Sequence, residues 1–169
     1  MNHLAFRRQP WKFCLGVCPR YLVLVGFLLS PVTLSCAGTS EMFVSDRLTG
    51  VAISGYDPVS YFMRADPTKG RREFESILDH VVFQFRNEGN RAAFVAHPDI
   101  YAPKFGGYDP IALARGIALA GNPLEWQIFG QRLYLFYDAR SHAAFAANPG
   151  AAIATADEQW PDVRKALIP

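Results

Sequence analysis

The side chains in this sequence that could bind a metal ion are few and far apart. Outside the first 37 residues the histidines are His80, His97 and His142, and none has His-x-His, His-x-x-x-His or Glu-x-x-His spacing. Zinc sites commonly use such spacings to place two ligands on one element. A metal site would therefore combine distant residues, and we take His97, His142 and Asp109 as the candidate imidazole and carboxylate ligands.

A tetrapeptide that occurs twice gives a second candidate site. Gly-Tyr-Asp-Pro is found at two places 52 residues apart. The carboxylates of Asp57 and Asp109 can accept hydrogen bonds from free N–H groups of helices that start at the following prolines. Tyr56 and Tyr108 precede them and could line a pocket, although aromatic side chains more often belong to a core. We expect a cleft between the two copies, with Tyr56, Asp57, Tyr108 and Asp109 as its candidate ligand-binding residues.

Longer segments recur at nearly the same distance. Arg-Ala-Ala-Phe-Val-Ala-His-Pro, which ends at Pro98, returns as His-Ala-Ala-Phe-Ala-Ala-Asn-Pro, which ends at Pro149. Before these segments, Val81-Val-Phe-Gln-Phe85 recurs as Arg132-Leu-Tyr-Leu-Phe136. Three matches in the same order indicate two copies of one unit, near residues 50–101 and 102–153.

Each copy has the pattern of a short helix, a β-hairpin and a second helix, which predicts a small α+β domain. Asn87 and Asp138 are the expected N-caps of the second helices. Phe94 and Phe145 are their expected buried anchors. Thr155-Ala-Asp-Glu158 has the capping-box pattern, which predicts the start of a last helix. The predicted elements are short helices at 58–63 and 110–117, strands at 74–77, 81–85, 126–129 and 133–137, second helices at 88–96 and 139–147, ended by Pro98 and Pro149, and a C-terminal helix at about 155–167.

The N-terminus has the three parts of a secretory signal. Residues 1–20 contain four basic residues and no acid, and Tyr21–Leu34 is a run of 14 residues without a charge. Small residues follow, so we predict a signal peptide over residues 1–37 and an exported, periplasmic mature chain from residue 38. Two alternatives stay open: an uncleaved membrane anchor, for which the apolar run is short, and a lipoprotein anchored through Cys36.

Cleavage there would remove Cys14, Cys18 and Cys36, which are all the cysteines. The mature chain would then hold no disulfide, thiolate metal site or thiol nucleophile. Four of the 17 basic residues would also be lost, and 13 basic minus 15 acidic residues gives a charge of −2. This small charge argues against a nucleic-acid partner. The expected partner is a small ligand or a protein, with membrane contact only through the signal sequence or a lipid on Cys36.

Several segments together resemble one known family. They are Val51–Phe62, Asn90–Pro98, Tyr101–Pro103, Gly106–Tyr108, Leu133–Leu135 and Trp160–Pro161. Between Leu48 and Trp160 the chain is similar to the YHS domain, and specifically to the exported YHS domain (seleno)proteins of bacteria. The resemblance implies a fold of two tandem YHS-like units, each with a hairpin and helices.

The resemblance also implies a site whose reactive residues have changed in this chain. YHS domains elsewhere carry cysteines suited to a soft metal such as copper, and the corresponding positions here are Ser60, Arg86 and Asn90. The exported family usually has cysteine or selenocysteine after Gly-Gly-Tyr, where this chain has Asp109. We therefore expect a non-catalytic ligand-binding or interaction module without a cofactor. The alternative is a periplasmic metal-handling protein that binds a transition metal through His and Asp.

Overall fold

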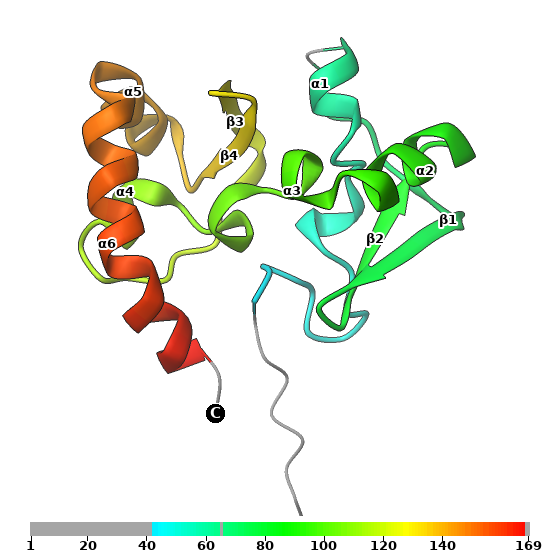
Figure 1. Cartoon of the computed structure of the whole chain (residues 1–169), viewed down its shortest axis with the longest axis horizontal. Helices are drawn as coiled ribbons and strands as arrows, with labels where there is room; N and C mark the ends of the chain where they lie inside the picture. The colour runs from blue at the N-terminus through cyan, green and yellow to red at the C-terminus, as the bar shows by residue number, and fades with distance from the viewer. Residues whose placement is uncertain (1–41, 65, 168–169) are drawn as a thin grey trace, which may run out of the picture. The chain divides into compact units, whose positions relative to one another are not determined.

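The computed structural model of this chain describes residues 42–64 and 66–167. These residues belong to one compact unit, Cys36–Pro169. The unit is mixed α+β with two antiparallel hairpins and several helices (Figure 1), which confirms the predicted fold class. The predicted signal peptide and Cys36 lie outside the described residues. Within residues 42–64 and 66–167, no helix is both long enough and apolar enough to cross a membrane.

The two hairpins have the same strand pairing, shifted by 51 residues. In the first, β1 (Arg71–Leu78) pairs with β2 (Val81–Phe85), and in the second, β3 (Asn122–Phe129) pairs with β4 (Arg132–Phe136). The register of both β1 and β3 shifts after the first paired residue. This bulge interrupts the alternation of side chains, so the sequence pattern placed the starts of β1 and β3 too late, at residues 74 and 126.

A two-residue turn closes each hairpin. The turn residues are Asp79 and His80 in the first (φ 48° and 66°) and Gly130 and Gln131 in the second (φ 54° and 60°). Positive φ at both positions defines a type I′ turn, whose twist matches that of the strands it joins. The predicted hairpins are confirmed, and His80 lies exposed in its turn.

A capped helix follows each hairpin, with the predicted bounds. The side chain of Asn87 accepts a hydrogen bond from Asn90 N at the start of α2 (Glu88–Ala96). Asp138 does the same for α5 (Ala139–Ala147), where it accepts from the backbone N–H of the third helical residue. An oxygen in this position binds one of the free N–H groups of the first turn.

The helices that come next differ in length between the copies. They are α3 (Pro98–Tyr101) and α6 (Pro149–Leu167), and each begins at the proline that follows the preceding helix. A proline ends one helix and suits the first position of another. The predicted start of the last helix at Thr155 is therefore wrong. The Thr155 hydroxyl donates to the carbonyl of Ala151 inside α6, whereas Asn148 accepts from Ala151 N at the true start.

Short helices begin each copy. The first copy has η1 (Ile53–Gly55) and α1 (Ser60–Arg64), and the second has η2 (Lys104–Gly107) and α4 (Pro110–Leu113). The prediction of a helix to residue 117 was too long. The helix ends at Leu113, and in the turn that follows Gly116 has φ 73° and donates its N–H to the carbonyl of Leu113.

The segment at the start of the described chain lies between η1 and η2. Val44 N donates to Gly106 O at 2.8 Å, and Val44 O accepts from Ile53 N at 3.2 Å. A Cβ at position 106 would clash with the carbonyl oxygen of Met42. Gly106 has φ 64°, so the position requires glycine for its backbone angle and for the close approach of this segment.

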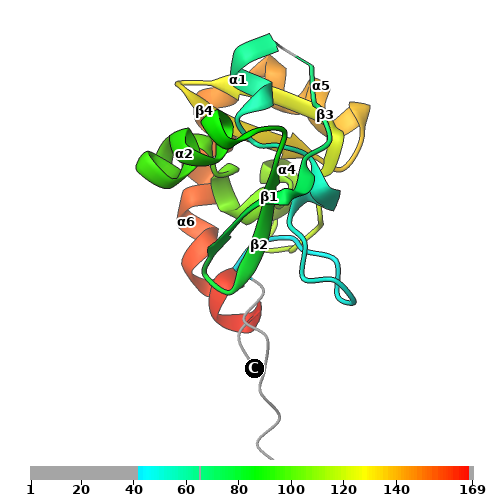
Figure 2. The same ribbon diagram turned by 90° about the vertical axis from the view of Figure 1, so that its right-hand side faces the viewer.

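The core consists of two clusters of buried side chains that meet at β4. Leu133 and Leu135 belong to the cluster of the first copy, with Phe83, Phe85 and Phe94. The alternate β4 side chains, those at positions 134 and 136, belong to the cluster of the second copy, which α6 covers. Figure 2 shows the β1–β2 hairpin in front and α6 behind it. The predicted burial of Phe94 and of its counterpart at position 145 is confirmed.

Candidate functional site

Asp57 is completely buried and holds three parts of the first copy together. Its Oδ1 accepts from Val59 N at 2.9 Å, at the start of the turn before α1. Its Oδ2 accepts from Arg86 N at 2.8 Å, just after β2, and from the side-chain amide of Asn90 at 2.6 Å, in α2. Burial of a carboxylate is costly unless hydrogen bonds replace water, and these three donors do so.

Asp109 is the equivalent residue of the second copy and is also completely buried. Its Oδ1 accepts from Ile111 N at 2.7 Å and Ala112 N at 3.1 Å, which makes it the N-cap of α4. Its Oδ2 accepts from Tyr137 N at 2.7 Å, just after β4. The predicted capping role is confirmed for Asp109, and each aspartate joins the start of a short helix to the end of a strand.

The tyrosines of the repeated tetrapeptide have different surroundings. Tyr56 is half-buried beside the first cluster, and the ammonium group of Lys69 lies 3.9 Å from the centre of its ring. Tyr108 is 5% exposed in the second cluster, and its ring centre lies 6.0 Å from that of Trp160. The two tyrosines thus pack against separate clusters, and both aspartates beside them are inaccessible to solvent.

The candidate metal ligands do not form a coordination group. His97 is exposed at the C-terminal end of α2. His142 stacks on Phe136, with 4.6 Å between ring centres, and its Nδ1 lies 3.5 Å from Glu125 Oε2. Asp109 uses both of its oxygens within the fold. Over the part of the chain that the structure describes, no three His, Cys, Asp or Glu side chains are grouped so that they could hold an ion.

The three positions at which the YHS resemblance implies cysteines meet around Asp57. The hydroxyl of Ser60 donates to the carbonyl of Asp57 at 2.7 Å and accepts from Thr68 N at 3.0 Å. Arg86 and Asn90 supply two of the donors to the Asp57 carboxylate. The local fold therefore brings together residues that are 30 positions apart in sequence, and it fills the space with a hydrogen-bond network.

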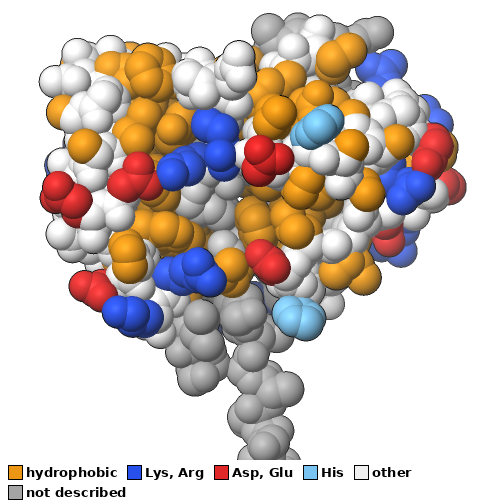
Figure 3. All heavy atoms as spheres, viewed as in Figure 1, with side chains coloured by type: hydrophobic (Ala, Val, Ile, Leu, Met, Phe, Trp, Pro, Cys, Tyr) orange, Lys and Arg blue, Asp and Glu red, His pale blue; other side chains and the backbone are white. Residues whose placement is uncertain are grey.

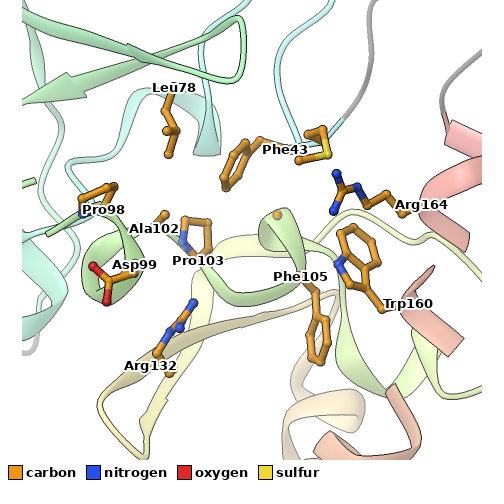
Figure 4. A pocket seen from close by; sticks show the side chains of 12 residues that line it. Phe43, Leu78, Pro98, Asp99, Ala102, Pro103, Phe105, Arg132, Trp160 and Arg164 are labelled. Carbon is orange, nitrogen blue, oxygen red and sulfur yellow. The ribbon is translucent and has the colours of Figure 1, made fainter. Parts of the chain in front are cut away.

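A pocket of about 280 Å³ opens elsewhere in the unit, where both copies contribute side chains. Leu78, at the end of β1, and Arg132, at the start of β4, line it together with Trp160 and Arg164 of α6 (Figure 4). Figure 3 shows a hollow that contains hydrophobic surface, with basic side chains along its left side and acidic side chains along its right. The other lining residues are Met42, Phe43, Pro98, Asp99, Ala102, Pro103, Phe105 and Gly106.

Arg132 is the polar residue of this pocket with the most unusual surroundings. Its side chain is half-buried, and its Nε is buried without a hydrogen-bond partner among the described residues. Burial raises the pKa of Tyr134, and the positive charge of Arg132 offsets part of this rise. Sequence reasoning missed Arg132 because a single arginine at a strand start is ordinary. The pocket depends on long-range packing that no local pattern encodes.

Comparisons of this chain with models of protein families, with curated proteins and with solved structures found no match. The function of the chain therefore has to be inferred from its sequence and from the geometry of its own side chains.

Proposed function

We propose that this chain is an exported, YHS-like domain that binds a small ligand without catalysing a reaction. The meeting of Ser60, Arg86 and Asn90 around Asp57 supports the resemblance, because positions with a shared role in a family should lie together in space. None of these three side chains is a thiolate, and none can bind a soft metal ion as a thiolate does. The likeness would thus be one of scaffold, with the reactive groups replaced.

The pocket beside Arg132 is the observation that carries the binding role. The carboxylates of Asp57 and Asp109 accept hydrogen bonds from backbone N–H groups and, for Asp57, from the Asn90 side chain, which gives them a structural role. The pocket has a different character, because both apolar and charged side chains face open space. Small-molecule sites are commonly clefts of about 300–1,000 Å³. An open pocket of about 280 Å³ lies just below this range, so the ligand is small.

Native mass spectrometry of tag-free protein, purified from the cell envelope, tests the proposal. We expect a protein that starts near residue 38, without stoichiometric copper or zinc, and with a bound small molecule. Leu78→Trp should lose that molecule because the larger ring would occupy the pocket. Ile77→Trp is the matched control, since Ile77 is the preceding residue on β1 and is 72% exposed.

Three results would contradict the proposal. Stoichiometric copper or zinc would favour metal handling. A protein that keeps its N-terminus and stays in the cytoplasm would end the export prediction. Equal loss of the molecule from the Leu78→Trp and Ile77→Trp variants would place the binding elsewhere.

A further inference from the structure

We propose that the pocket selects a small organic monoanion, in which a carboxylate is attached to a flat apolar body. Arg132 supplies the counter-charge inside the pocket and Arg164 supplies a second charge at its edge. This inference rests on the proposed binding function and specifies the ligand class of the same site.

The state of Arg132 is the main reason for an anionic ligand. A guanidinium group has five N–H donors and stays charged at any physiological pH. Arg132 Nε is buried and out of reach of a ligand, but the terminal Nη groups are not among the buried donors that lack a partner. Neither Arg132 nor Arg164 forms an ion pair within the described ranges. A charged group that lines a pocket without a counter-ion favours an anionic ligand, and the Nη groups of an arginine can bind a carboxylate through two parallel hydrogen bonds.

The arrangement of the pocket agrees with a ligand that is charged at one part and apolar at another. Figure 4 shows the guanidinium groups of Arg132, from β4, and Arg164, from α6, both directed toward the pocket. The side chains of Phe43, Leu78 and Trp160 supply apolar surface to the same pocket. A flat apolar body would remove this surface from water, and an anionic group would meet Arg132.

The charge of the lining favours a monoanion. Two arginines and one carboxylate, that of Asp99, face the pocket, so the lining carries a net charge of +1. Asp99 forms no ion pair with Arg132 within the part of the chain described here, so it does not neutralise the arginine directly. It would repel a second negative charge on the ligand.

Titration of the purified protein with benzoate and benzamide, followed by NMR, tests the inference. The two probes have the same shape, and only benzoate is charged. We expect benzoate to bind at least about tenfold more tightly, since hydrogen bonds between charged groups are about twice as strong as neutral ones. Inorganic phosphate, which has no apolar body, should bind more weakly than benzoate.

Variants assign the charge effect to the pocket. Arg132→Gln should weaken benzoate binding about tenfold or more and leave benzamide binding unchanged. Arg164→Gln should weaken it less because Arg164 is exposed to solvent. Arg140→Gln removes the same charge from an exposed position that does not line the pocket, and should change nothing. Melting temperatures of all variants show whether each one folds.

Equal affinity for benzoate and benzamide would overturn the inference, and this comparison needs no variant. Phosphate that binds as tightly as benzoate, or benzoate binding that Arg132→Gln and Arg140→Gln weaken equally, would also overturn it. In each of these cases the proposed binding function would still be supported if native mass spectrometry showed that the co-purified molecule is lost from the Leu78→Trp variant and kept by the Ile77→Trp variant. Failure of both experiments would reject both proposals.

Discussion

The second strands of the two hairpins show how differently one repeated unit is used. In β2, buried residues alternate with half-buried ones, and Gln84 on the outer face bonds to Glu75. In β4, the four residues from Leu133 to Phe136 are all buried. One face of β4 packs in the first cluster and the other in the second. The second hairpin has therefore become the centre of the unit, while the first has one face near solvent.

The first copy supplies the additional burial of β4. The face of β4 that has no buried counterpart in β2 carries Leu133 and Leu135, and both pack in the first cluster. Helix α3, which follows the first hairpin, and η2 contact β4. In the second copy, α6 has 19 residues and contributes side chains to the cluster that contains Tyr134 and Phe136. Similar sequences thus give similar hairpins, but the segments that pack against each hairpin decide which faces are buried.

The largest expected effect tests the feature that both copies share. Asp57→Ala and Asp109→Ala should each lower the free energy of unfolding by roughly 3–5 kcal/mol, because each leaves buried N–H donors without an acceptor. Chemical denaturation measures both values. Asp57→Asn and Asp109→Asn keep one acceptor oxygen and should cost less. If Asp109→Ala had wild-type stability, Asp109 would have no structural role and would become a ligand candidate again.

A smaller effect tests the difference between the strands. Leu135 and Gln84 occupy equivalent positions, paired with Trp126 and Glu75 respectively. Leu135→Gln should cost about 2–4 kcal/mol, since it buries an amide without partners in place of an apolar side chain. Gln84→Leu should change stability by only about 0.5 kcal/mol because that face of β2 is partly exposed. Urea denaturation of the two variants provides the test, and equal losses would mean that β4 is not buried on both faces.

The smallest effect concerns a hydroxyl that only the first copy has. Tyr61 is 2% exposed and donates to Pro123 O at 2.9 Å, while Leu113 occupies its position in the second copy. Tyr61→Phe should cost about 1 kcal/mol at neutral pH through loss of this hydrogen bond, as measured by urea denaturation. Leu113→Met, a change of similar size without a hydrogen bond, is a control for packing.

The same variant should change the dependence of stability on pH. Burial raises the pKa of Tyr61 above that of a tyrosine in the unfolded chain, which is about 10. The unfolded state therefore loses its proton first, so stability is intact below about pH 10 and falls as pH rises further. Tyr61→Phe should make this loss of stability at alkaline pH shallower. Part of the loss should remain because burial also raises the pKa of Tyr134. An unchanged slope in unfolding measured from about pH 8 to 11 would contradict the burial of Tyr61.

The elements that local chemistry determines could be predicted from the sequence. Asn87 and Asp138 cap their helices as expected, because a short polar side chain before a helix bonds to its own neighbours. Both hairpins also followed from local sequence, with the turn of the second at Gly130-Gln131, whereas Leu78, expected in the first turn, is the last paired residue of β1. The start of α6 did not, because the capping-box pattern at Thr155 competes with Asn148 and the proline after it, and tertiary packing decides between them.

The candidate site was harder to predict than the fold. The sequence drew attention to Asp57 and Asp109 because they recur, yet a buried structural carboxylate and a ligand-binding one have the same pattern. The structure separates them by burial and by their hydrogen bonds. The pocket joins Leu78, Arg132 and Trp160, residues distant in sequence and without a shared motif, so only the folded chain reveals them.

The bonds between Val44 and both short 3₁₀ turns limit how far proteolytic trimming can extend from the N-terminus. Removal of Phe43 would take a 9% exposed ring from the core and from the wall of the pocket. A peptidase that cuts before Met42 leaves this contact intact, whereas one that cuts a few residues later would damage the stability and the pocket together. Proteins truncated to begin at residue 45 or beyond would thus be poor substitutes for the whole domain.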